Sequence, residues 1–455
     1  MRSRDAAARE AGKPASDARR IMASIDEFAR MTSTAQGVTR LAYTPMERVA
    51  HEHFAKHMEN LGLRVWTDPA GNTIAEKPGD PGRPEAYGGR GAVGTGSHLD
   101  SVPGAGRFDG IAGVAAAMEC ARLVVEHGIA HHHPFRFVAF AAEEGARFGQ
   151  ACLGSRFATG KMSSAQVTSL QDADRVTLGE AMKQVGLDPD LALGTPWPAA
   201  EWSAFVELHV EQGGILDAAG VPVGVVDLVS GSTRLRLTVT GQSSHTGATP
   251  MGQRADALTG ACEIALIAEE LAQDPRHRGT RATVGTLDVR PGSLTTIPGQ
   301  VRLGLDVRDI DSDRQRAATA EIVRRARSVC DRRGLALAVE VLGDTSPAVL
   351  PLWLRSVIAD ACRTEQVPYQ VLTSGASHDS QVVNSLMPAA IVFVPSSNGL
   401  SHVPQEWTSA GDLARGTDVL LATLRMVDQE LVRLAQLDRA DEPAEQEPSM
   451  PGARR

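Results

Sequence analysis

The chain has 455 residues, 42% of them hydrophobic and 22% charged, which is an ordinary composition for a folded protein and a length that exceeds one hydrophobic core. Two domains are therefore expected. The formal net charge of −9 argues against nucleic acid or an anionic membrane as a partner. Five cysteines without CxxC spacing and the lack of a long apolar run predict a cytoplasmic protein with reduced thiols and no membrane span.

The two ends of the chain have the composition of unfolded segments. Residues 1–22 are rich in Ala and Arg and lack the apolar stretch of a secretory signal, and residues 437–455 are rich in Pro and Glu. Such polar segments bury too little apolar surface to offset the entropy of folding. We expect both to be disordered tails.

The first half of the chain alternates helical and strand patterns. Residues 24–62 carry apolar residues at helical spacing, and two strands separated by the turn cluster DPAGN follow. A small-residue strand in GAVGTGSHLD then precedes an Ala-rich helix over 110–128 and the buried strand FRFVAFAAEE. Strand, helix and strand in this order predict a crossover unit and a mixed, largely parallel sheet with helices on both faces, the α/β class.

The pattern changes between residues 231 and 345. TRLRLTVTGQ alternates as a half-buried strand, and the elements that follow give the order strand, helix, strand, strand, helix, strand. That order is typical of a ferredoxin-like α+β unit. Because strand patterns resume beyond 345, we expect a domain over 231–345 inserted into a larger domain formed by 23–230 and 346–436.

Histidines and acids cluster just after the predicted strands of the larger domain. Taken singly, each has a structural explanation: a lone strand histidine packs in the core or lies at the surface, an EE pair is solvated, and an Asp before GIAG caps a helix. Together they fall beside small, glycine-rich backbone, where buried polar groups need partners and a metal ion is one. The set is His98, Asp100, Asp109, Glu143, Glu144, His209 and His402.

This set of ligand types suits two divalent ions, with zinc expected and manganese, cobalt or nickel remaining open. One carboxylate can bridge the pair, which then generates a hydroxide near neutral pH and polarises a carbonyl. A carboxylate that binds no metal must accept the water's proton and pass it to the leaving nitrogen. Glu143 and Glu144 can divide these roles, because neighbouring strand side chains point in opposite directions.

Six motifs resemble the amidase, hydantoinase and carbamoylase branch of the M20 metallopeptidase superfamily, over about residues 37–425. That branch includes N-carbamoyl-L-amino-acid hydrolases, allantoate amidohydrolases, ureidoglycolate amidohydrolases and β-ureidopropionases. The motifs stand in family order and are GSHLDSVPGAGRFDGIAGV, AAEEGARFGQACLGSR, ELHVEQGGILDAAGVPVGVV, TVTGQSSHTGATPMGQRADAL, SGASHDSQ and FVPSSNGLSHVPQEWT.

The resemblance implies a role for each residue of the cluster. Asp109 is similar to the bridging carboxylate and Glu143 to the general base, while Asp100 is similar to the acid that orients a histidine ligand. The remaining ligands are expected in two pairs, His98 with His209 on one metal and Glu144 with His402 on the other.

The resemblance also implies a homodimer in which the inserted domain serves as lid and dimerisation surface. His245 in SSHTGATP is then expected to reach the partner's active site and stabilise the oxyanion. Arg308 is expected to grip a substrate carboxylate, although a surface arginine paired with a neighbouring aspartate fits the same pattern. Gln212 and Gly375 match further substrate-contact positions, and Thr295 stands where the family usually has Asn.

The expected activity is hydrolysis of N-carbamoyl-L-amino acids to amino acid, ammonia and carbon dioxide. Allantoate or ureidoglycolate hydrolysis is the alternative, because these substrates also combine a ureido group with a carboxylate. An M20 aminoacylase or peptidase fits the motifs less well, and an inactive relative is disfavoured because every presumed ligand is present. His131, His132 and His133 are interpreted as a solvated turn, and Ser155 and Ser377 lack the surroundings of a nucleophile.

Overall fold

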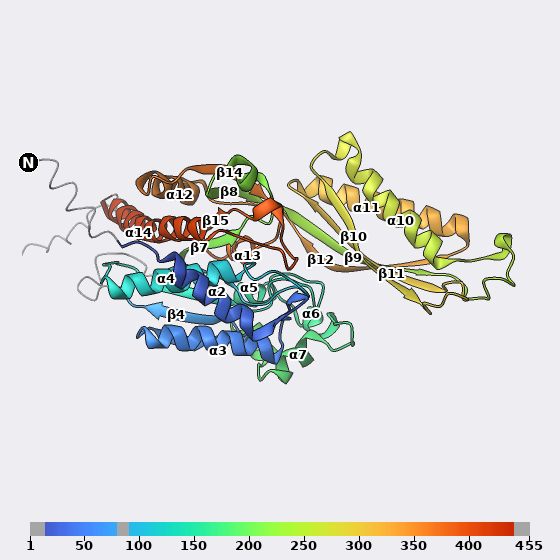
Figure 1. Cartoon of the computed structure of the whole chain (residues 1–455), viewed down its shortest axis with the longest axis horizontal. Helices are drawn as coiled ribbons and strands as arrows, with labels where there is room; N and C mark the ends of the chain where they lie inside the picture. Colours follow the sequence, from blue (N-terminus) through green and yellow to red (C-terminus); the bar gives the residue numbers. More distant parts are fainter. Residues whose placement is uncertain (1–13, 80–90, 441–455) are drawn as a thin grey trace, which may run out of the picture.

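The computed structural model describes residues 14–79 and 91–440. Figure 1 shows a large unit, from which a narrower unit projects along the long axis of the molecule. We call the part built from β9–β12 with α10 and α11 the small unit, and the remainder the large unit. Their sheets are separate, with nine strands in the large unit and four in the small unit.

The large unit contains most of the helices and strands. Its helices are α2 (Ala18–Thr32), α3 (Pro45–Asn60), α4 (Ile111–Glu126), α5 (Leu153–Ala158), α6 (Ser164–Ser169), α7 (Leu178–Gln184), α8 (Pro189–Gly194), α9 (Ile215–Ala219), α12 (Leu352–Thr364), α13 (Asp379–Val383) and α14 (Ala410–Ala440), with single turns η1 (Ala199–Glu201) and η4 (Ser397–Gly399). Its strands are β3 (Arg64–Thr67), β4 (Thr73–Lys77), β5 (Ala92–His98), β6 (Phe135–Phe140), β7 (Trp202–Val210), β8 (Val223–Val229), β13 (Ala348–Val349), β14 (Tyr369–Ser374) and β15 (Ala389–Val394), and β1 (Ser33–Thr34) pairs with β2 (Gly37–Val38) apart from them.

The large sheet is mixed, with its parallel strands at the centre. The strand order is β13-β8-β15-β7-β5-β6-β4-β3, and β14 also pairs with β8. β15, β7, β5 and β6 run parallel to one another, whereas β4, β3 and β13 add antiparallel edges. The prediction of a largely parallel sheet therefore holds for the four central strands and for the β14–β8 pair, whereas the remaining pairs are antiparallel. The expected βαβ crossover runs from β5 through α4 to β6.

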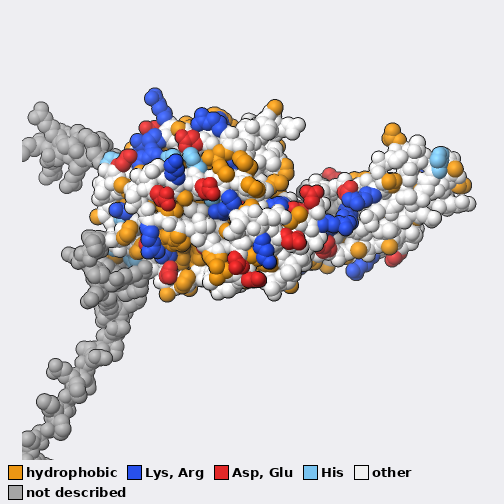
Figure 2. Space-filling model, turned by 90° about the horizontal axis from the view of Figure 1, so that it is seen from below, with side chains coloured by type: hydrophobic (Ala, Val, Ile, Leu, Met, Phe, Trp, Pro, Cys, Tyr) orange, Lys and Arg blue, Asp and Glu red, His pale blue; other side chains and the backbone are white. Residues whose placement is uncertain are grey.

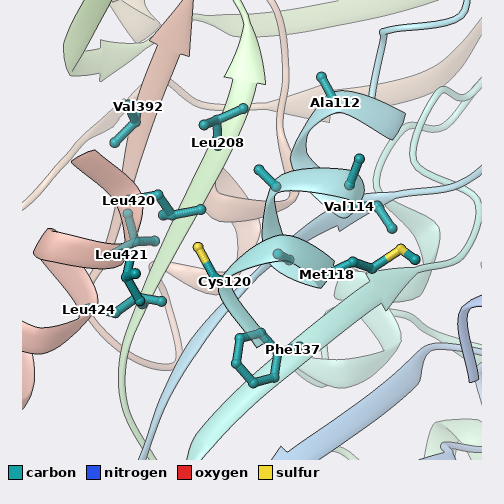
Figure 3. Packing of buried hydrophobic residues seen from close by; sticks show 14 of the residues in the cluster. Ala112, Val114, Met118, Cys120, Phe137, Leu208, Val392, Leu420, Leu421 and Leu424 are labelled. Carbon is teal, nitrogen blue, oxygen red and sulfur yellow. The ribbon is translucent and has the colours of Figure 1, made fainter. Parts of the chain in front are cut away.

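Both faces of this sheet are buried. Neighbouring residues of β6 belong to different hydrophobic clusters: Phe137 packs with residues of α4 and α14, and Val138 belongs to the cluster of Trp197 and Phe205. Figure 3 shows α4 and α14 side by side against the central strands, with Cys120 of α4 and Leu420 of α14 among the buried side chains. The all-buried patterns of β5, β6 and β15 follow from this coverage, and the sequence of β15, AAIVFV, is apolar throughout.

The small unit has a ferredoxin-like arrangement. Its elements follow the order β9 (Gly231–Thr240), α10 (Ala257–Gln273), β10 (Arg281–Arg290), β11 (Gln300–Asp309), α11 (Ser312–Arg333) and β12 (Ala336–Thr345), with turns η2 (Met251–Gln253) and η3 (Pro275–His277). The strands are antiparallel in the order β10-β11-β9-β12, and α10 and α11 cover one face (Figure 1). Ser232 pairs with Thr345, so the chain enters and leaves this unit at one place.

Two boundary predictions and one loop prediction are wrong. Asp17 accepts hydrogen bonds from Arg19 N and Arg20 N and starts α2 at Ala18, so residues 18–22 are helical. At the other end α14 continues to Ala440, so residues 437–440 are helical too, while residues 1–13 and 441–455 of the predicted tails lie outside the described residues.

The triple-histidine loop before β6 is not a solvated turn. His131 and His133 are buried, and His131 stacks on Phe135 with ring centroids 4.2 Å apart. Asp428 of α14 accepts hydrogen bonds from His133 Nδ1 and from the backbone N–H groups of residues 132 and 133, at 2.8 to 3.0 Å. Because the Asp428 carboxylate accepts hydrogen bonds from these N–H groups, His133 can be buried without unsatisfied donors.

None of the described helices combines the length and apolarity needed to cross a bilayer. In the view of Figure 2, basic and acidic side chains are interspersed over both units rather than gathered into one field.

Candidate metal centre and substrate pocket

The predicted cluster comes together at the carboxyl ends of four neighbouring strands. His98 is the last residue of β5, the two glutamates follow β6, His209 is on β7, and His402 follows β15 and η4. Because these strands are parallel and adjacent, their ends meet at one edge of the sheet. Asp109, just before α4, enters the same place and is buried.

Asp109 lies between two groups of side chains. Its Oδ1 is 3.5 Å from His98 Nε2 and 3.3 Å from His209 Nε2, and the two imidazole nitrogens are 3.4 Å apart. Its Oδ2 is 3.1 Å from His402 Nε2, which is 3.3 Å from Glu144 Oε2. Each oxygen of one carboxylate thus belongs to a separate trio of possible ligands and faces the two other members of that trio.

The donor set fits two divalent metal ions. Two ligands about 2.0–2.1 Å from one zinc ion at tetrahedral angles lie about 3.3 Å apart, which is the spacing of these atoms. Glu144 Oε1 is buried and has no hydrogen-bond partner among the described residues. Imidazole nitrogens and carboxylate oxygens are ligands that zinc, manganese, cobalt and nickel all accept, so the geometry fits the predicted cofactor class without selecting one metal.

Contacts at Nδ1, on the side of each ring that faces away from the cluster, orient His98 and His209. His98 Nδ1 is 3.1 Å from the backbone oxygen of Asp100 and 3.4 Å from its Oδ1, and His209 Nδ1 is 2.9 Å from Val210 O. These contacts place an N–H on each Nδ1 and leave Nε2 free to bind a metal. The carboxylate of Asp100 also accepts hydrogen bonds from Glu143 N and Glu144 N, at 2.8 and 3.1 Å.

The short distances between carboxylates and imidazoles shift the pKa values of the cluster. Burial raises the pKa of Asp109, but hydrogen bonds from His209, His402 and His98 outweigh it and hold this pKa well below its usual range. Burial lowers the pKa of His402, but hydrogen bonds to Asp109 and Glu144 raise it to about 11. The acids that raise the pKa of His402 also favour a bound divalent cation.

Glu143 differs from the other acids because it stands beside the cluster rather than within either trio. Its Oε2 is 3.9 Å from His98 Nε2, and its Oε1 accepts a hydrogen bond from Cys152 Sγ at 3.0 Å. Burial raises the pKa of Glu143 to about 7, although His98 opposes this shift. A carboxylate with that pKa can both take and return a proton near neutral pH.

A cavity of about 550 Å³ opens beside the cluster, between the two units. Gln212, Gly375 and His402 line it from the large unit, and Arg281 and Arg308 line it from the small unit. Gln212 Nε2 donates a hydrogen bond to Asp109 Oδ2 at 2.6 Å, so this amide reaches the candidate metal ligands.

Arg308 connects the two units within this cavity. It donates to Asp306 Oδ2 at 3.0 Å and to Gly375 O at 2.9 Å. The pairing with a neighbouring aspartate that the sequence left open is therefore present, and the same guanidinium also lines the cavity. The expected grip of Arg308 on a substrate carboxylate stays a prediction.

His245 and Thr295 lie elsewhere. Both are exposed, in loops beyond the far end of β9, and Thr246 N donates to Thr295 O at 3.1 Å. β9 begins at Gly231, beside the large unit, and its ten residues span roughly 30 Å at about 3.3 Å per residue. Within one chain, therefore, neither residue reaches the metal cluster.

Three residues near the site were missed by sequence reasoning. Cys152 contacts Glu143, and Arg281 stands opposite Arg308 in the β10–β11 register. Glu406 is buried against Gly106 in the loop that leads to Asp109. Glu406 lies in the HVPQE motif, from which sequence reasoning singled out His402 alone. No spacing in the sequence reveals the β10–β11 register that places Arg281, or the turn into α5 that brings Cys152 to Glu143.

The fold and the site define an α/β protein with a candidate metal centre at the strand ends and a polar pocket beside it. Residues 94–426 match the family model described as peptidase family M20/M25/M40. The chain belongs to this family, within its amidase, hydantoinase and carbamoylase branch.

Curated relatives and solved structures agree with this assignment. The chain is 38% identical over 417 residues to the N-carbamoyl-L-amino-acid amidohydrolase of Paenarthrobacter aurescens, covering 90% of this chain and 98% of the relative. It is 32% identical over 416 residues to the ureidoglycolate hydrolase of Arabidopsis thaliana, covering 90% and 86%. A solved amidase of the hydantoinase/carbamoylase family from Burkholderia vietnamiensis has a TM-score of 0.85 at 31% identity, covering 91% and 98%. The protein is accordingly a hydrolase that acts on carbon–nitrogen bonds other than peptide bonds.

Proposed function

We propose that this protein hydrolyses N-carbamoyl-L-amino acids to the L-amino acid, ammonia and carbon dioxide, at a dinuclear metal centre. The proposal rests on the position of Asp109, whose two oxygens belong to two separate trios of ligand atoms. Glu143 lies beside these trios and is a member of neither. This arrangement supports His98, Asp109 and His209 as ligands of one ion and Asp109, Glu144 and His402 as ligands of the other. Bound divalent ions, with zinc our choice, supply a nucleophilic hydroxide and polarise the ureido carbonyl.

The general base in this proposal is Glu143. Its carboxylate is buried, its pKa is raised to about 7, and neither of its oxygens belongs to a ligand trio. It takes the proton of the attacking water and returns it to the leaving nitrogen, which departs as ammonia. The N-carboxy amino acid that remains then loses carbon dioxide, with cleavage of its own C–N bond, to give the L-amino acid. Asp100 holds the backbone of both glutamates and the ring of His98, so it fixes the relative positions of base and ligands.

Substrate recognition is assigned to the cavity between the units. Arg308 offers a planar pair of N–H donors to the α-carboxylate, and its contact with Gly375 O marks where that carboxylate would bind. Asp306 partly neutralises Arg308 in the free enzyme, so substrate must compete with this partner. Gln212, which already reaches Asp109, is placed to contact the ureido group.

The remaining predicted residues act from a second copy of the chain. We propose a homodimer in which the small unit serves as lid and dimerisation surface, and His245 and Thr295 complete the partner's site, with His245 stabilising the oxyanion. Two apolar side chains support a contact there, because Leu294 is 100% exposed and Met251 is 77% exposed in the same pair of loops. The five cysteines are all described and form no disulfide, which supports the cytoplasm as the location.

Hydrolysis of ureidoglycolate or allantoate is the second candidate. The likeness to the Arabidopsis thaliana ureidoglycolate hydrolase favours it, and the same metal centre and arginine would serve any substrate that joins a ureido group to a carboxylate. An aminoacylase or peptidase activity is the third and weakest candidate, since its substrates lack the ureido group that Gln212 would contact.

The deciding experiment measures ammonia release by the zinc- or manganese-loaded protein from a panel of substrates. The panel contains several N-carbamoyl-L-amino acids, N-carbamoyl-β-alanine, allantoate and ureidoglycolate, and amine release is followed with an N-acetyl amino acid. We expect the N-carbamoyl-L-amino acids to have the highest kcat/KM. Preference for allantoate or ureidoglycolate would replace the proposed substrate, and turnover of the N-acetyl compound alone would replace the reaction class. Glu143→Gln is the control for contaminating activity.

A further inference from the structure

A second group of metal-ligating side chains lies on the outside of the large unit, where α2 meets α3. It consists of Glu27 on α2 and of His53 and His57 on α3. One ligand atom from each residue can be chosen so that all three lie within 4.8 Å of one another. None of these residues belongs to the cluster at the strand ends, and none is used in the proposed reaction.

The helical spacing of the two histidines aims them at one point. Residues four apart lie on the same face of a helix, and the imidazole rings of His53 and His57 have centroids 5.3 Å apart. Glu27 approaches from the neighbouring helix, with its Oε2 already 3.1 Å from His53 Nε2. The bare chain therefore holds one pair of ligand atoms at the separation that a shared metal ion requires.

The surroundings favour an ordered and accessible site. The fully buried ring of Phe28 packs edge-on against His53, with centroids 5.1 Å apart, and restricts that imidazole. The side chains of His53 and Glu27 remain 28% and 38% exposed, so an ion can enter from solvent and keep water in its open positions.

The charge balance of the group allows a cation. Burial and the neighbouring His53 lower the pKa of His57, although Glu27 opposes this shift. Arg122 lies near enough to oppose a cation, but its charge is shared with Glu119 at 3.5 Å and Glu126 at 4.0 Å. Glu27 supplies the negative charge within the group itself.

We propose that Glu27, His53 and His57 form an accessory site for one imidazole-preferring divalent transition metal, such as zinc or nickel, which joins α2 to α3. Two imidazoles and one carboxylate match the ligand preference of these ions rather than that of magnesium or calcium. A bound ion would fasten α2 to the large unit. Through Asp26, whose carboxylate binds Arg107 at 2.6 Å, α2 also contacts the loop that carries Asp109.

The test counts zinc bound to the full-length protein after equilibrium dialysis over a range of buffered free Zn²⁺. We expect wild-type protein to bind one more ion per chain than His57→Ala, with both retaining the same number of tightly bound ions. His127→Ala is the matched control, because it removes an exposed histidine from the end of α4 and should behave like wild type. Equal zinc uptake by wild type and by folded His57→Ala would overturn the proposal.

Thermal unfolding provides a second measurement. Ions that bind the folded chain raise its melting temperature as their concentration increases. Added zinc should raise the melting temperature of wild type beyond the point at which the catalytic centre is saturated, and Glu27→Gln and His53→Gln should each weaken this second rise. These two substitutions also carry the test if His57→Ala does not fold. A second rise that persists unchanged in both would place the additional ion elsewhere and overturn the proposal.

Discussion

Cys152 Sγ donates a hydrogen bond to Glu143 Oε1 at 3.0 Å, and the backbone N–H of Cys152 donates to the backbone oxygen of Glu143 at 2.6 Å. One residue therefore holds both the main chain and the carboxylate of the proposed base. Cys152 adopts a left-handed backbone, with φ of 60°, which costs an L-residue conformational energy and is typical of positions constrained by function.

Replacing the thiol should therefore affect catalysis more than folding. For Cys152→Ala we expect kcat to fall roughly two- to tenfold, the effect of losing about 0.5–1.5 kcal/mol from one hydrogen bond. Cys152→Ser keeps a donor and should retain more activity than the alanine variant. Steady-state kinetics of both variants check this, and a serine variant slower than the alanine variant would show that packing, rather than the donor, matters.

The role of His245 predicts complementation between two defective chains. His245→Ala alone should lower kcat about 10²- to 10³-fold, and Glu143→Gln about 10²- to 10⁴-fold. In a mixed dimer, one site combines an intact Glu143 with the partner's intact His245. Random mixing of the two variants should then restore about a quarter of the wild-type activity, since half the dimers are mixed and each has one complete site. If His245 acts within its own chain, mixing restores nothing.

Removal of the metal ions should affect both activity and stability. The strand-end cluster packs Asp109 and Glu144 against His98, His209 and His402, and all of these side chains except the exposed His402 are buried. Chelation should abolish ammonia release and lower the melting temperature, because an ion present at about 100 times its Kd stabilises the fold by about 2.7 kcal/mol. Adding zinc or manganese back should reverse both changes. Asp109→Asn should lose both catalytic ions in a metal count, whereas loss of only one would contradict the bridging role.

Asp428 predicts a pH-dependent contribution to stability. Burial raises its pKa, but hydrogen bonds from His133 and from the loop backbone outweigh this and lower it below the usual value. A depressed carboxyl pKa stabilises the fold above the unfolded pKa of about 3.9, and this stabilisation is lost as the pH falls through the folded value. Asp428→Asn should lower the free energy of unfolding by about 1–3 kcal/mol at pH 7. In urea unfolding, its difference from wild type should shrink below about pH 4.

A matched substitution controls for the general effect of removing a carboxylate from a helix. Asp360 on α12 is exposed and pairs with Arg363 one turn away. Asp360→Asn should change the free energy of unfolding by less than about 0.5 kcal/mol at either pH. A loss as large as that of Asp428→Asn would show that the loop contacts of Asp428 are not the cause.

The sequence predicted the elements best where the chemical pattern was local. The Ala-rich helix after GRFDG, the buried strand FRFVAF and the element order of 231–345 all have short-range signals, and each is present in the structure. The positions of the predicted ligands at strand ends were also foreseeable, because parallel strands bring their carboxyl ends together. Their roles as ligands remain a prediction.

What the sequence missed depends on contacts between distant segments. The sequence around His133 predicts a solvated turn, because its partner, Asp428, is 295 residues away and no local pattern reveals the contact. The first turns of α2 were assigned to a disordered tail, because their composition is polar and the burial of Ile21 arises only from packing on the large unit. Cys152 gave no signal as a lone cysteine, and its approach to Glu143 depends on how the chain turns into α5.

The pairing of Ser232 with Thr345 has a consequence for how enzymes of this kind diversify. Because the chain departs from and returns to the large sheet at one point, recombination that exchanges residues 231–345 between relatives would leave the catalytic strands joined as before. Such an exchange would transfer Arg281, Thr283, Asp306 and Arg308, which line the pocket, as one block without altering any residue of the strand-end cluster. The part of the selectivity that these four residues set is thus separable from the strand-end cluster, whereas Gln212 and Gly375 stay with the large unit. Chimeras built at these two junctions should acquire only the part of the donor's preference that the block determines.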